Sequence, residues 1–109
     1  MPSMNSESGW LEPWYPVEDA SKADALLKEL RQELSKSHVL FGVNASAIGA
    51  RQDCDDVAFR LNDGKIAVVH LTYAQHPETN PSYPSTEIFE NWASFVASRM
   101  ETDHNDWTA

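Results

Sequence analysis

Apolar residues recur at intervals of three and four positions between Ser21 and Ser37, the spacing that gathers them on one face of an α-helix. Asp19 or Ser21 can cap the start of this helix, because a short polar side chain accepts hydrogen bonds from the first free amides. Charged residues fill the opposite face. The pattern therefore predicts a scaffold helix with one buried face. Its apolar positions are Ala23, Leu26, Leu27, Leu30 and Leu34.

Two apolar stretches joined by Asn62-Asp63-Gly64 predict a β-hairpin over residues 57–73. A type I turn with Gly64 in the left-handed conformation forms a bulge and places Leu61 opposite Lys65. One face of the hairpin is then strongly apolar and must be the core side. A two-residue turn at Asp63-Gly64 would instead place His70 opposite Val57, and it separates the two faces less cleanly. The expected core-side pairs are Phe59 with Ala67, Val57 with Val69, and Asp55 with Leu71.

The other face of the hairpin is half apolar, and such a face is rarely left bare. We expect the aromatic segment from Trp10 to Tyr15, a second subunit or a ligand to cover it. Pro13 and Pro16 exclude a regular helix in that segment, so it is interpreted as an extended strap. The pairs on this face are Asp56 with His70, Ala58 with Val68, Arg60 with Ile66, and Cys54 near Thr72.

A first strand over Val43 to Arg51 and a final helix from near Ser85 complete the predicted elements. The expected fold class is α+β, a two-layer sandwich in the order helix, three-stranded antiparallel meander, helix, with both helices on one face. Residues 1–9 are expected to be a disordered N-terminus, 10–103 a single domain and 104–109 a C-terminal tail. The apolar stripe of the final helix comprises Ile88, Phe89, Trp92, Phe95, Val96 and Met100.

The charge of the chain narrows the classes of partner. Its 109 residues carry a formal net charge of −9, and an acidic surface repels nucleic acid and anionic membranes. A basic protein partner is compatible with this charge, although the charge can also serve solubility alone. Cys54 is the single cysteine, so no internal disulfide can form. Without a signal peptide or a long apolar run, the chain is expected to be cytoplasmic.

The run Asp53-Cys54-Asp55-Asp56 is the most concentrated candidate for chemistry. Neighbours on a strand point to opposite faces, and neither a calcium-loop spacing nor a zinc-type spacing of Cys54, His70, His76 and His104 is present, so no metal site is predicted. Asp56 could orient His70, which could in turn activate the Cys54 thiol. Lone cysteines more often behave as small hydrophobes, so a cross-strand pair of Asp56 and His70 is the favoured interpretation.

The loop from Tyr73 to Tyr83, with His76 and Glu78, is a second candidate site. It could form the floor of a small-molecule cleft near Trp92, or it could be a proline-stiffened connection. The candidate residues for ligand or partner binding are Arg60, Ile66, Val68, His70, Thr72, Tyr73 and Tyr83.

Residues 53–92 resemble a small family of bacterial domains of no known activity. The similar parts are residues 53–57, Asp63-Gly64, the AVVHLT run at 67–72, and the pattern of Pro84, Thr86 and Phe89. The resemblance implies a compact bacterial α+β domain. It implies no catalytic residues.

Together these observations favour a non-catalytic acidic binding domain that recognises a protein partner or a second copy of itself as a homodimer. No cofactor is predicted. The alternative is a small enzyme or ligand-binding domain centred on Asp56, His70 and the Tyr73–Tyr83 loop. In that alternative Cys54 is a further weak catalytic candidate.

Overall fold

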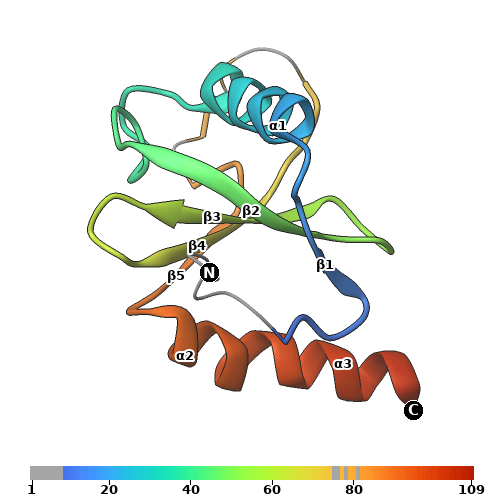
Figure 1. The fold of residues 1–109 in the computed structure, drawn as a ribbon. Coiled ribbons are helices and arrows are strands. Elements are labelled where there is room, and N and C mark those ends of the chain that lie inside the picture. Colours follow the sequence, from blue (N-terminus) through green and yellow to red (C-terminus); the bar gives the residue numbers. More distant parts are fainter. Residues whose placement is uncertain (1–8, 75–76, 78, 81) are drawn as a thin grey trace.

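The fold is an antiparallel five-stranded sheet with helices on both faces. The computed structural model describes residues 9–74, 77, 79–80 and 82–109. The sheet has the strand order β1-β2-β3-β4-β5, so each strand pairs with the strands next to it in sequence (Figure 1). The strands are β1 Trp14–Pro16, β2 Ala45–Arg51, β3 Asp56–Leu61, β4 Ile66–His70 and β5 Thr86–Phe89.

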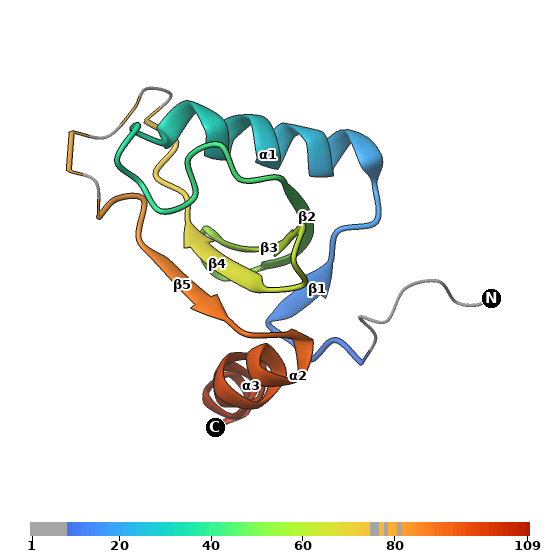
Figure 2. The ribbon, with the colours of Figure 1, turned by 90° about the vertical axis from the view of Figure 1, so that its left-hand side faces the viewer.

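Helix α1, Ala20–Glu33, lies on one face of the sheet, and a C-terminal helical segment lies on the other (Figure 2). This C-terminal helix consists of α2 Trp92–Phe95, the π-helical turn η1 Val96–Met100 and α3 Glu101–Thr108. None of the described helices is long and apolar enough to cross a membrane.

The predicted cap and the predicted hairpin are both confirmed. The Asp19 carboxylate accepts hydrogen bonds from the amides of Ser21 and Lys22 at the start of α1. In the hairpin, Gly64 has a φ of 91°, which is the left-handed conformation that the bulged turn requires. Asp56 pairs with His70, and the register continues through the rest of β3 and β4 as the turn dictates.

The core-side face of the hairpin packs beneath α1, as its apolar pattern predicts. The buried leucines of α1 lie in one cluster with side chains of β2, β3 and β4. Phe59 belongs to this cluster and is fully buried. The other sheet residues of this cluster include Val57, Leu61, Ala67, Val69 and Leu71.

The opposite face of the sheet carries a second core. Ala58, Ile66 and Val68 are buried there by Trp14 and by the C-terminal helix, so Ile66 retains only 1% of its surface exposed. The Trp14 ring meets the Phe95 ring edge-on at 5.2 Å between centroids. The aromatic strap therefore does cover this face, as one of the predicted alternatives stated.

Trp10 reaches this second core because Gly49 has no side chain. A Cβ atom at Gly49 would overlap the six-membered ring of Trp10. The ring also packs against Trp92, with centroids 5.0 Å apart. A glycine inside a strand often marks such a close approach of another segment.

The α+β class is confirmed, but the finer architecture differs from the prediction in three respects. The sheet has five strands and not three, because Trp14–Pro16 and Thr86–Phe89 add one strand at each edge. The two helical layers lie on opposite faces, which gives three layers and not two (Figure 2). The first element is a strand, β1, and not a helix.

The predictions for the C-terminus and for the segment before the last helix were also wrong in part. Thr86–Phe89 is a strand, so the last helix begins at Trp92 and not near Ser85. That helix continues to Thr108, so most of the predicted tail is helical. Most of the predicted disordered N-terminus, residues 1–8, lies outside the described residues, as do His76 and Glu78 of the second candidate site.

Candidate functional site

Asp56 and His70 form a directly bonded pair across β3 and β4. The Nδ1 atom of His70 lies 2.7 Å from Oδ1 of Asp56. Since a carboxylate only accepts hydrogen bonds, Nδ1 is the protonated ring nitrogen. In the neutral ring Nε2 is then an acceptor. The His70 side chain is 54% exposed, whereas that of Asp56 is only 12% exposed.

Arg99, on the C-terminal helix, joins this pair to two further carboxylates. Its Nη2 donates to Oδ2 of Asp56 at 2.5 Å, and its Nε donates to Asp103 at 3.0 Å. A third, longer contact of 3.3 Å joins Nη1 to Glu87 on β5. Burial by itself would lower the pKa of Arg99, but the carboxylates of Asp103 and Asp56 outweigh it and raise the pKa.

Asp103 extends the network to the two N-terminal strands. Its Oδ2 accepts a hydrogen bond from the Trp14 indole at 2.8 Å and lies 3.1 Å from the Arg51 guanidinium. Arg51 also forms a bidentate pair with Asp53, and this hydrogen bonding lowers the pKa of the Asp53 carboxyl. Arg99 and Asp103 therefore bond the C-terminal helix directly to β1, β2, β3 and β5, and His70 on β4 joins the network through Asp56.

A hollow of about 370 Å³ opens beside the Asp56–His70 pair. Ser85, the residue just before β5, lies across from His70, and its carbonyl accepts a hydrogen bond from the His70 amide at 2.9 Å. The Glu87 side chain is 60% exposed. The lining residues are Asp56, Val68, His70, Ser85, Glu87 and Arg99.

The Cys54 thiol is not part of this cluster. Cys54 lies exposed in the connection between β2 and β3. Although the residue as a whole is exposed, its thiol is partly shielded from water, and this desolvation raises the pKa of the thiol, so the thiolate is disfavoured. Of the predicted relay from Asp56 through His70 to Cys54, the described contacts include the Asp56–His70 hydrogen bond but no contact between His70 and Cys54.

The predicted binding residues are spread over different parts of the molecule. Of the seven predicted binding residues, only His70 and Val68 line the hollow beside the Asp56–His70 pair. Ile66 and Val68 are buried under Trp14 and the C-terminal helix, so the alternatives in which a second subunit or a ligand covers them are wrong. The amides of Thr72 and Tyr73 instead donate to the buried Glu33 carboxylate of α1, at 2.8–3.1 Å.

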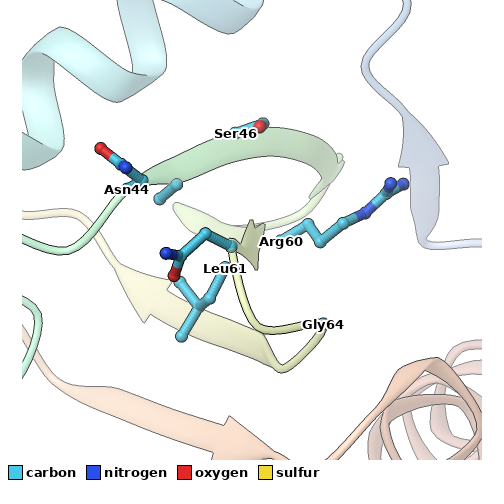
Figure 3. A pocket seen from close by; sticks show the side chains of 7 residues that line it. Asn44, Ser46, Arg60, Leu61 and Gly64 are labelled. Carbon is cyan, nitrogen blue, oxygen red and sulfur yellow. The ribbon is translucent and has the colours of Figure 1, made fainter.

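Arg60 lines a separate hollow of about 330 Å³ next to the hairpin turn. Figure 3 shows its guanidinium extending away from Asn44 and Ser46 on the same rim. The polar groups there do not converge on one point, so this hollow is the weaker candidate.

The residues that sequence reasoning missed are Ser85, Glu87, Arg99 and Asp103 in the network, and Glu33 and His38 on the other face. His38 is buried and links two segments: Nδ1 accepts from the Leu40 amide, and Nε2 lies 3.0 Å from the Pro84 carbonyl. Arg99 carried one usable signal, since it is the only lysine or arginine after Lys65. Asp103 follows it by four positions, the spacing of a helical ion pair.

Metal binding has no geometric support in the part of the chain that the structure describes. No group of three or more His, Cys, Asp or Glu side chains there is arranged to hold an ion.

Comparison with protein-family models, with curated proteins and with solved structures finds no match to this chain. The resemblance to a family of bacterial domains therefore stays a prediction.

Proposed function

We propose that the protein is a non-catalytic acidic binding domain, and that the hollow beside His70 receives a basic side chain of a protein partner. The acceptors around the hollow are the observation that carries the proposal. Because Asp56 fixes the proton on Nδ1, the neutral His70 ring presents Nε2 as an acceptor. The exposed Glu87 carboxylate and the Ser85 hydroxyl are on the same rim.

The charge balance around Arg99 supports the same choice of ligand. Within the network, the guanidinium groups of Arg99 and Arg51 face four carboxylates, which leaves an excess of negative charge. These carboxylates belong to Asp53, Asp56, Glu87 and Asp103. Lysine and arginine side chains are donors only, so they match a rim of acceptors. The net charge of −9 would also attract a basic partner over longer distances.

Self-association through the second face of the sheet loses its basis. That proposal depended on an uncovered apolar surface at Ala58, Ile66 and Val68, and all three side chains are buried within one chain. A heterologous basic partner is therefore favoured over a homodimer formed by this face.

NMR titration of the isotope-labelled protein with an oligolysine peptide tests the proposal. We expect the backbone amides of His70, Ser85 and Glu87 to show the largest shift changes. An oligoglutamate peptide of equal length is the control and should leave these amides unchanged. Shift changes spread evenly over all acidic parts of the surface would contradict a specific site.

A second candidate function is ester hydrolysis. The row Asp56, His70 and Ser85 favours it, because His70 on β4 pairs with Asp56 on β3 and bonds to Ser85, the residue just before β5. Ser85 Oγ would attack the carbonyl carbon while His70 Nε2 takes the hydroxyl proton and later delivers it to the leaving alkoxide. Water would then hydrolyse the acyl-enzyme. Fluorophosphonate labelling that disappears in Ser85→Ala would support this candidate, and failure to label the wild-type protein would exclude it as a serine hydrolase.

A further inference from the structure

The two edges of the sheet are protected differently. At one edge, β1 has three residues and ends in Pro16, which has no amide hydrogen to offer a further strand. At the other edge, β5 has the sequence Thr-Glu-Ile-Phe, without proline or lysine. No described element lies beyond β5 (Figure 2).

The register identifies which backbone groups of β5 face outward. The His70 amide donates to the Ser85 carbonyl, so the backbone amide and carbonyl of Ser85 point toward β4. Successive residues of a strand alternate in the direction of their amide and carbonyl groups. Glu87 and Phe89 therefore also bond toward β4, while the backbone groups of Thr86 and Ile88 point away from the sheet. The Pro84 carbonyl is already bonded by His38, so the open edge begins at Thr86.

The side chains of β5 give this edge two chemically different sides. Glu87 pairs with Val68 and so lies on the side of the hollow. Ile88 pairs with Ala67 on the α1 side, and 39% of its surface is exposed. Val39, which is 64% exposed, follows His38, whose ring lies 3.2 Å from the Thr86 hydroxyl.

We propose that an extended segment of the basic partner adds to β5 as a sixth strand. Main-chain hydrogen bonds to Thr86 and Ile88 hold the segment, and alternate side chains supply specificity. A basic residue lies beside Glu87 and the hollow, and an apolar neighbour packs on Ile88. This inference rests on the proposed function, because it names how the partner of that site binds.

A second copy of the chain fits this edge less well. Two β5 strands related by a two-fold axis can pair Thr86 of each with Ile88 of the other. That register places Glu87 directly opposite Glu87 of the second copy. Like charges in directly opposite positions destabilise a pair of strands, whereas a lysine in that position is attracted.

The test uses a short peptide of alternating lysine and valine, and a block peptide of the same composition as its control. We expect the alternating peptide to bind more tightly and to slow hydrogen exchange at the Thr86 and Ile88 amides. N-methylation of the peptide amides that face β5 should weaken binding about tenfold, because two or more main-chain hydrogen bonds are lost.

The possible outcomes separate this inference from the proposed function. If N-methylation and residue order have no effect while Glu87 and His70 amides still shift, the edge is not used and the basic-group site stands. If the two outward amides are protected in a dimer without peptide, the occupant is a second copy and the inference is wrong. If no basic peptide binds at all, both proposals are wrong.

Discussion

Arg99 bonds carboxylates of both the sheet and the C-terminal helix. It bonds Asp56 and Asp103, whose side chains are only 12% and 11% exposed. Poorly hydrated carboxylates depend on such partners, because removal of one partner leaves the other charge without compensation. The orientation of His70 depends in turn on Asp56. A single arginine thus stabilises the fold and positions the candidate site.

Replacing Arg99 with methionine should lower the free energy of unfolding by about 2–3 kcal/mol, because Asp56 and Asp103 each lose a charged donor. Urea denaturation measures this loss. Arg31→Met, at an exposed position of α1, is the matched control and should change stability by less than about 0.5 kcal/mol. An equal loss in both variants would show that the network contributes nothing specific.

Cys54 should react slowly with iodoacetamide at neutral pH. Partial burial raises the pKa of its thiol, so the reactive thiolate forms only at higher pH. The midpoint of the rate against pH is expected above that of a free cysteine, which is about 8.5. A midpoint below the free value would mean an activated thiol and would return Cys54 to the candidate nucleophiles.

The elements differ in how far the sequence predicts them. The α1 helix and the β3–β4 hairpin have long, regular patterns, and the turn chemistry at Gly64 is sufficient to set the Asp56–His70 register. The β5 strand was missed because Ile88 and Phe89 also fit the apolar stripe of the helix that follows. Pairing with β4 makes this segment a strand, and a local sequence pattern does not show that pairing.

The candidate site likewise contains residues whose placement the sequence predicts and residues whose placement it does not. Asp56 and His70 belong to one hairpin, so their contact follows from a turn. Arg99 and Asp103 come from a helix whose side of the sheet was predicted wrongly, and Ser85 and Glu87 come from the missed edge. Contacts between distant elements depend on the packing of the whole chain, which no single segment determines.

Gly49→Ala should destabilise the protein by about 1–3 kcal/mol, because the added methyl group overlaps the Trp10 ring. We expect Trp10 to be displaced from Trp92, with a red shift of tryptophan fluorescence. Ser46→Ala, at an exposed position of the same strand, is the control and should leave the spectrum unchanged. An unchanged spectrum and stability for Gly49→Ala would contradict the packing of Trp10 on β2.

The whole molecule is organised around a sheet that is buried on both faces. The α1 side and the C-terminal side each have their own cluster of buried side chains. Because both faces are covered, a partner can reach the sheet itself only at its edges. The candidate hollow lies beside one of these edges, β5.

Phe59→Ala and Phe95→Ala compare the two cores, since each side chain is fully buried on a different face. Each substitution should cost about 3–5 kcal/mol, because a large cavity replaces a packed ring. Denaturant unfolding followed by circular dichroism gives both values. A loss for Phe59→Ala together with no loss for Phe95→Ala would indicate that the C-terminal helix does not pack on the sheet.

The affinity of an oligolysine peptide for two single-charge variants tests the proposed binding site most directly. Glu87→Gln removes a carboxylate at the hollow, and Glu18→Gln removes an exposed carboxylate just after β1, at the opposite edge of the sheet. Calorimetry at physiological ionic strength should show binding weakened roughly threefold to fivefold by Glu87→Gln, with less than about a twofold change for Glu18→Gln. Equal weakening by the two variants would show that the peptide responds only to net charge, and that the acidic surface serves solubility.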